Sequence, residues 1–147
     1  FYWHFSGRAE LLTALLTNWR KRMTTNVIAR LGAQTDGPTL RLRALLALPR
    51  RSKSPEFARI EQSIRDWSRR DELAHAAVSE VDAIRLNYLV ELFEQHGFEH
   101  IAARRRAYIA YAMLMGDSVL RDTLEPDSAD VVLDEIMELL TQKHPPL

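Results

Sequence analysis

The sequence predicts an all-α protein, and three observations support this fold class. The chain of 147 residues holds only five glycines and six prolines, so long stretches of good helix formers run between few breakers. Within these stretches apolar residues recur at steps of three and four, the spacing of one helix face. The alternating pattern of a half-buried strand extends over no useful length. The breakers divide the chain into six expected helices.

Three of these helices are expected in the amino-terminal half. The first is expected over 6–31, where Gly32 ends it, and at ~1.5 Å per residue it would be roughly 36 Å long. A short second helix is expected over 36–48, followed by a basic loop over 49–53. The third begins at 54–56 with a capping Ser, a first-turn Pro and an acid near the positive helix end.

The other three expected helices fill the carboxy-terminal half. One begins at Asp71 and ends at Gly97, the next spans about 99–124, and the last about 128–142. The middle of the second of these, 107–115, is apolar almost all round and should be deeply buried.

Charge is divided unevenly along a chain whose 20 basic and 20 acidic residues cancel. Residues 1–70 hold 14 basic and 5 acidic side chains, and residues 71–147 hold 6 and 15. This asymmetry indicates an electrostatic role for one half, or an attraction between unlike halves within one fold.

Composition excludes several classes of protein. The length suits one domain, and the absence of cysteine excludes disulfides, thiolate metal sites and cysteine nucleophiles. No apolar run approaches the ~20 residues of a membrane span, and no secretion leader is recognised, so we expect a cytoplasmic protein with no membrane partner.

The last two expected helices are too apolar for the surface of a small monomer. They could complete a four-helix bundle with the same pair from a second copy, which predicts a homodimer, or they could fill a monomer core. The residues expected at the dimer interface are Tyr108, Ile109, Ala112, Leu120, Val132, Ile136, Leu139 and Leu140.

An aromatic cluster directly before a long amphipathic helix resembles one segment of the tetracycline-repressor (TetR) family. In that family such a segment ends the recognition helix and opens the next one. The matching positions are Tyr2, His4, Phe5, Arg8, Glu10, Leu11 and Leu12. More diffuse likeness to the family's effector-binding domain runs through 64–67, 81–93, 97–98 and 103–108.

The resemblance implies two unequal parts. Residues 1–6 would be the end of a truncated helix-turn-helix domain, and residues 7–147 a helical effector-binding and dimerisation domain, with the helix over about 7–31 bridging the two. Most of the DNA-binding domain would be missing, so the chain alone should not bind operator DNA specifically. The residues expected to contact DNA are Tyr2, Trp3, His4 and Arg8, whereas Phe5 should pack in the core.

The resemblance also implies a pocket for an unknown small-molecule effector, lined mostly by large apolar residues. For any one of them, plain core packing is the alternative. The expected pocket residues are Trp19, Met23, Leu42, Leu45, Phe57, Ile60, Ile64, Trp67, Tyr88, Tyr111 and Met113.

Catalysis and metal binding have little support. Glu72 and His75 form one Glu-x-x-His pair, but diiron bundles use two pairs. Asp82 and Arg85 suggest a structural ion pair. We therefore expect no cofactor, no metal and no enzyme, and a regulator that is released from DNA by an effector, most simply a repressor. A dimeric helical interaction module without a ligand is the alternative, and a bundle metalloenzyme is a more remote one.

Overall fold

The computed structural model describes residues 7–51, 56–120 and 126–143, and within them it confirms the all-α fold class. No strand occurs in these three segments. The helices are α1 (Arg8–Met23), α2 (Thr25–Gln34), α3 (Pro38–Arg51), α4 (Glu56–Trp67), α5 (Glu72–His96), α6 (His100–Leu120) and α7 (Pro126–Thr141). Each helix of the described part is too short or too polar to cross a membrane.

In place of the one expected helix over 6–31, the structure has two, because the chain breaks at Thr24. This residue has φ −129° and ψ −84°, is 2% exposed, and donates its hydroxyl to the carbonyl oxygen of Arg20 at 2.5 Å. Threonine side chains that bond back to the preceding turn compete with the helix and bend it. The break also brings the carbonyl oxygen of Met23 within 3.3 Å of Nε of Arg85, which donates to it.

The longest helix, α5, begins and ends where the sequence predicts. The side chain of Asp71 accepts the backbone N–H of Ala74 at 2.9 Å and so caps the first turn. Gly97 ends the helix with φ 114°, and the N–H of Phe98 reaches back to the carbonyl of Phe93 at 3.1 Å. The two Phe rings meet edge to face, with centroids 6.0 Å apart, which completes a Schellman-type end.

Other helix ends differ from the prediction by a few residues. The expected basic loop over 49–53 begins later, because α3 continues through Pro49 to Arg51. Pro126 occupies the first turn of α7, a position where its missing N–H costs nothing. The capping residues 54–55 and the end of the fifth expected helix, 121–124, lie outside the described residues.

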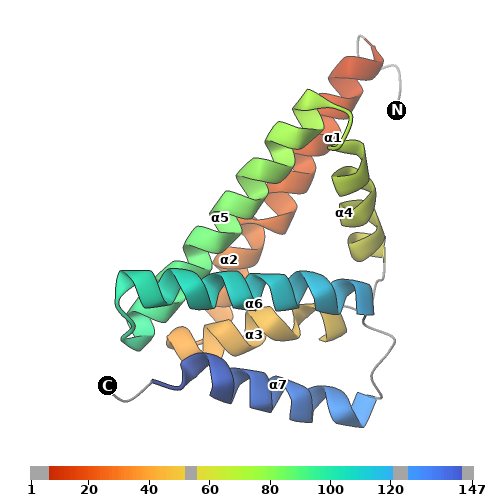
Figure 1. Ribbon diagram of the computed structural model, residues 1–147. Coiled ribbons are helices and arrows are strands. Elements are labelled where there is room, and N and C mark those ends of the chain that lie inside the picture. Colours follow the sequence, from red (N-terminus) through yellow and green to blue (C-terminus); the bar gives the residue numbers. More distant parts are fainter. Residues whose placement is uncertain (1–6, 52–55, 121–125, 144–147) are drawn as a thin grey trace.

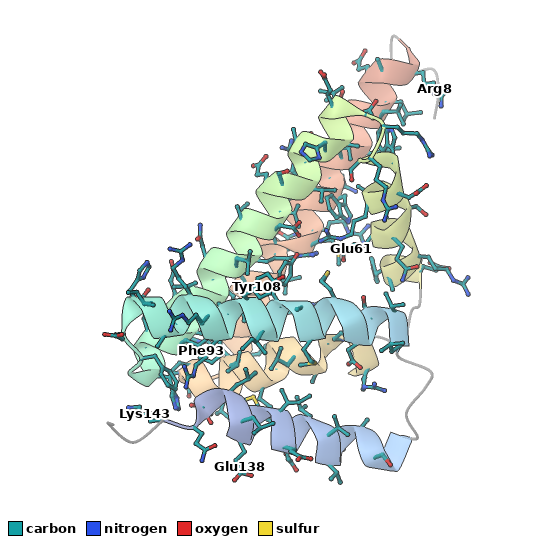
Figure 2. All side chains as sticks on the ribbon, in the orientation of Figure 1. Arg8, Glu61, Phe93, Tyr108, Glu138 and Lys143 are labelled. Atoms are coloured by element: carbon teal, nitrogen blue, oxygen red, sulfur yellow. The ribbon has the colours of Figure 1, made fainter. Side chains whose placement is uncertain are left out.

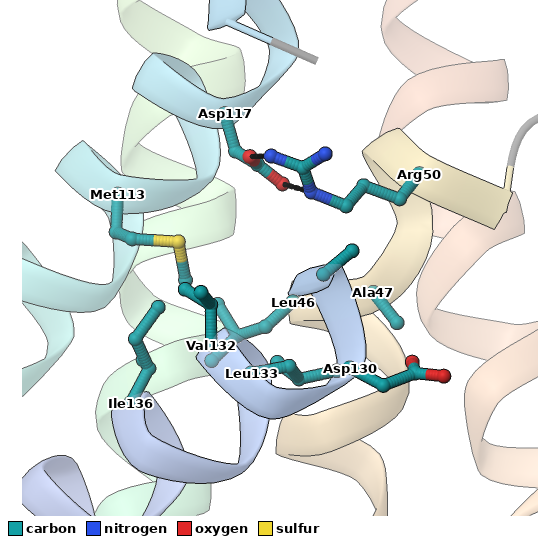
Figure 3. A pocket seen from close by; sticks show the side chains of 10 residues that line it. Leu46, Ala47, Arg50, Met113, Asp117, Asp130, Val132, Leu133 and Ile136 are labelled. Atoms are coloured by element: carbon teal, nitrogen blue, oxygen red, sulfur yellow. Dashed lines mark hydrogen bonds and ion pairs between the residues drawn. The ribbon is translucent and has the colours of Figure 1, made fainter. Parts of the chain in front are cut away.

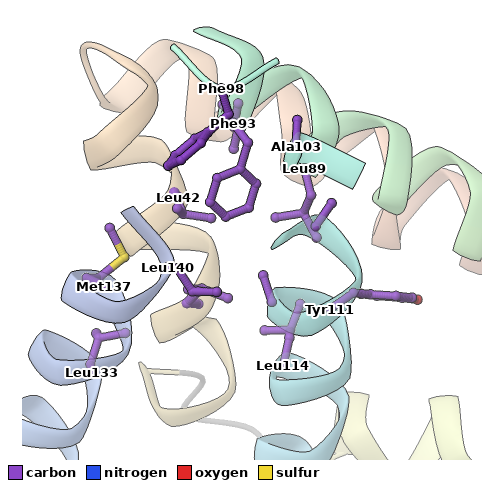
Figure 4. Packing of buried hydrophobic residues seen from close by; sticks show 14 of the residues in the cluster. Leu42, Leu89, Phe93, Phe98, Ala103, Tyr111, Leu114, Leu133, Met137 and Leu140 are labelled. Carbon is purple, nitrogen blue, oxygen red and sulfur yellow. The ribbon is translucent and has the colours of Figure 1, made fainter. Parts of the chain in front are cut away.

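Two apolar clusters divide the interior, and α5 belongs to both. At one end, α3 and α6 pack on the second half of α5 and α7 packs on α3, and side chains of these helices surround the fully buried Phe93 (Figures 1 and 4). At the other end, Leu16 and Trp19 of α1 pack on Ala74, Ala77, Val78 and Val81 of α5. Helix α4 lies beside this second cluster, where it packs on α5 (Figure 1).

Candidate functional site

A groove of about 570 Å³ lies between α1 and α4. Its volume falls within the range of roughly 300–1,000 Å³ that is typical of small-molecule sites. Six of the eleven expected pocket residues line it, two from α1 and four from α4: Trp19, Met23, Phe57, Ile60, Ile64 and Trp67.

The groove forms because two amphipathic helices share one support. Both α1 and α4 pack on α5, and each carries an apolar stripe with helical spacing toward the space between them. The apolar lining is incompletely covered, since Leu15 and Ile60 are each 47% exposed. Trp19 is 5% exposed, and its indole N–H is buried without an acceptor in the described chain.

The structure adds lining residues that sequence reasoning missed. Three leucines precede Trp19 by three, four and seven positions, a spacing that could have placed them on the same face. The polar residues that also line the groove follow no sequence pattern that could have identified them. The added residues are Leu12, Leu15, Leu16, Asn18, Arg22, Arg59 and Ser63.

Four of the other expected pocket residues lie in the cluster around Phe93, away from the groove. These are Leu42, Leu45, Tyr88 and Met113. Met113 also lines a cavity of about 50 Å³ beside the ion pair of Arg50 with Asp117 (Figure 3). That cavity has room for a few water molecules, not for an effector.

A partly buried network of ion pairs and hydrogen bonds joins α4 to α5 and α6 beside the groove. Glu61 of α4 is 8% exposed and accepts from Nη1 of Arg85 at 2.5 Å and from Nη2 of Arg65 at 3.3 Å. Arg65 also donates to Asp82 of α5 at 2.5 Å. Tyr111 of α6, the last expected pocket residue, donates its hydroxyl to Asp82 and accepts from Arg65 at 3.1 Å. Figure 2 shows Glu61 in the angle between α4, α5 and α6.

The expected ion pair between Asp82 and Arg85 is wrong, because each group has another partner. Although three positions apart on α5, both side chains face α4, which presents Arg65 to Asp82 and Glu61 to Arg85. Asp82 therefore pairs with a residue 17 positions away, and Arg85 with one 24 positions away, instead of with each other.

The network shifts the ionisation of its members. Burial alone would raise the pKa of Asp82, but hydrogen bonds from Arg65 and Tyr111 and the nearby positive charges hold that pKa below its usual value. Burial raises the pKa of Tyr111 to about 12, and its hydrogen bond to Asp82 adds to the shift although Arg85 opposes it. At neutral pH Asp82 is therefore a charged carboxylate beside two guanidinium groups, while Tyr111 is a neutral phenol.

The expected DNA contacts lie mostly outside the described residues. Tyr2, Trp3 and His4 belong to residues 1–6. Arg8 is exposed as the first residue of α1, at the tip of the molecule far from α7 (Figures 1 and 2).

The expected dimer residues divide into an exposed and a buried group. Tyr108, Ile109, Leu120 and Leu139 are 57–69% exposed, Ala112 is exposed, and Val132 and Ile136 are half-buried. Leu140 is 5% exposed and packs in the cluster around Phe93. Three further apolar residues of the same two helices are exposed and were missed: Ile101, Val119 and Val131.

Glu72 and His75, the remaining candidate pair, are both exposed on α5. The described residues contain no group of three or more His, Asp and Glu side chains that could hold a metal ion. Comparison with protein-family models, with curated proteins and with solved structures finds no match to this chain.

Proposed function

We propose that this chain is the effector-binding and dimerisation part of a TetR-like one-component transcriptional regulator, a repressor that a small molecule releases from DNA. The observation that carries the proposal is the groove between α1 and α4. It has the size and apolar lining of a ligand site, and one of its walls is the helix that begins directly after the segment expected to contact DNA.

The two walls of the groove are held differently, which supports a role in switching. Helix α4 is tied to α5 by a buried ion pair of Glu61 with Arg85 and a partly exposed one of Arg65 with Asp82, and to α6 by a hydrogen bond from Arg65 to Tyr111. Helix α1 is held on α5 by apolar contacts of Leu16 and Trp19, by the hydrogen bond from Arg85 to its last carbonyl, and by a partly exposed ion pair between Arg20 and Glu80. Because apolar contacts lack the fixed direction of ion pairs, we take α1 as the wall that shifts in this proposal.

A ligand in the groove would then act on DNA binding through α1. If it binds more tightly at one separation of α1 and α4, it shifts the population toward that arrangement, and only this difference in affinity can drive the change. A shift of α1 moves the tip at Arg8. In a dimer, two such tips would no longer match half-sites one helical turn apart.

The exposed apolar side chains on α6 and α7 support the dimer in this proposal. Tyr108 and Ile109 of α6 and Leu139 of α7 are large apolar side chains exposed on helices that both pack on α3. Exposed apolar side chains that gather into a patch mark interaction sites. The same surface would serve the alternative function, a dimeric helical module without a ligand. The groove favours the regulator.

Selection of DNA from a random library by the complete gene product tests the proposal. We expect enrichment of a two-fold symmetric site whose half-sites lie about one helical turn, or a multiple of it, apart. A Tyr108→Glu/Leu139→Glu variant should lose the symmetric site, while a Glu72→Gln/His75→Gln variant, changed on an exposed part of α5, should keep it. Recovery of no sequence above non-specific binding by the intact protein would refute the proposal.

A further inference from the structure

We infer that the groove between α1 and α4 binds an elongated apolar molecule with a carboxylate at one end. As the identity of a regulatory effector, this inference rests on the proposed function; as a statement about binding, it rests on the groove alone. Charge, the order of side chains along the groove and unpaired donors in its wall each support it.

The groove carries positive charge without a compensating acid. Among its thirteen lining residues two are arginines and none is acidic. The guanidinium group of Arg22 lies 5.2 Å from the centroid of the Phe57 ring, and Arg59 is exposed. Neither arginine forms an ion pair with a described residue, unlike Arg65 and Arg85 nearby. Arginine binds carboxylates with a planar pair of donors, so a negative group is the natural partner here.

The charge is concentrated at one end. Helices α1 and α4 run in opposite directions (Figure 1), so Arg22, near the end of α1, faces the beginning of α4 at Phe57. The other end of the groove is lined by Leu12 of α1 and Trp67 of α4 and has no charged lining residue. Leu12 and Arg22, at the two ends, are ten positions apart on α1, about 15 Å at ~1.5 Å per residue.

This order of side chains matches a long amphipathic anion. The half-exposed Leu15 and Ile60 would lose contact with water when an apolar chain covers them, which favours binding. The indole N–H of Trp19, buried without an acceptor in the described residues, is a further unpaired donor in the wall. The two arginines would repel a cationic ligand, and the apolar lining of the groove would offer a wholly polar ligand few hydrogen-bond partners.

Dodecanoate is a suitable probe, used below its micelle concentration with the complete chain. Binding can be followed by the fluorescence of Trp19 and Trp67, which line the groove, and by calorimetry. We expect saturable binding of one molecule per chain. An Arg22→Gln/Arg59→Gln variant should bind about tenfold more weakly, as should wild-type protein with dodecanol, because a hydrogen-bonded charge pair is lost.

Two further variants separate the groove from general effects. Arg30→Gln/Arg104→Gln removes two exposed arginines outside the groove and should bind dodecanoate as the wild type does. Ile60→Trp should fill the groove and abolish binding, while circular dichroism and the unfolding midpoint show that the fold is kept.

Absence of saturable binding, equal binding of dodecanoate and dodecanol, or undiminished binding by the Ile60→Trp variant would overturn the inference. The proposed function is tested separately from the ligand class. If dodecanoate binds but the complete gene product selects no DNA site, the regulator is refuted and the ligand class stands. If a DNA site is found but dodecanoate does not bind, the ligand class is refuted and the regulator stands.

Discussion

Replacing Glu61 with Gln should lower the free energy of unfolding by about 3 kcal/mol, the lower end of what breaking a buried ion pair costs. The carboxylate of Glu61 lies 2.5 Å from Nη1 of Arg85, and the two side chains are only 11% and 12% exposed. Glutamine keeps the size of the side chain but removes the charge that compensates Arg85. Burial alone would lower the pKa of Arg85, yet a guanidinium stays protonated in proteins, so the charge cannot be relieved by losing a proton. The value is placed at the lower end because the hydroxyl of Tyr111 and the carbonyl of Met23 still accept from Arg85.

Urea unfolding followed by far-ultraviolet circular dichroism measures this loss, with an unchanged m-value as evidence that the folded state is as compact as before. The matched control is Asp66→Asn on the same helix. Asp66 pairs with Arg70 at 3.5 Å, but both side chains are more than 60% exposed, so about 0.5 kcal/mol or less should be lost. Adding Arg85→Met to Glu61→Gln should recover part of the stability, because the buried charge left without its partner is then removed. A loss below about 1 kcal/mol for Glu61→Gln would refute this reasoning.

Three other experiments test separate parts of the structure. Because burial raises the pKa of Tyr111 to about 12 from about 10 in an unfolded chain, the neutral phenol stabilises the fold below pH 10, and roughly 2–3 kcal/mol should be lost between pH 10 and 12. Tyr111→Phe should reduce that loss in unfolding titrations, and an equal loss in both proteins would contradict the assignment. Gly97→Ala should lower the free energy of unfolding by about 1–2 kcal/mol because of strain at φ 114°, whereas Gly32→Ala inside α2 should raise it. Changes of the same sign in both variants would contradict this expectation. Tyr108→Glu/Leu139→Glu should convert a dimer into a folded monomer in light scattering, and a wild-type protein that is already monomeric would exclude the dimer.

The choice of interface residues for that last test depends on the structure. Ile136 is among the interface residues expected from the sequence, but it is half-buried and packs against the cluster around Phe93. A charge there would disturb the monomer itself. Tyr108 and Leu139, 69% and 64% exposed, make few contacts that the monomer needs.

The groove shows how much of a binding site can be predicted from sequence patterns alone. Trp19, Phe57 and Trp67 could be selected as pocket candidates, because large apolar side chains at helical spacing are visible in the sequence. The pattern could not separate them from Leu42 or Met113, which have the same character. Whether such residues line an open groove or fill a core depends on which helices α5 brings together. The groove residues lie at one end of α5, and the core residues around Phe93 lie at the other end.

Signals that lie within one turn of helix account for what was predictable: the helical fold class, the cap at Asp71, the end at Gly97 and the apolar face of each helix. Such signals act between neighbours in the chain, so a single sequence contains them in full. The exchange of partners between Asp82 and Arg85 and the gap between α1 and α4 required the tertiary structure. These features arise from contacts between residues far apart in the chain, and their energies depend on how well whole helix faces fit each other.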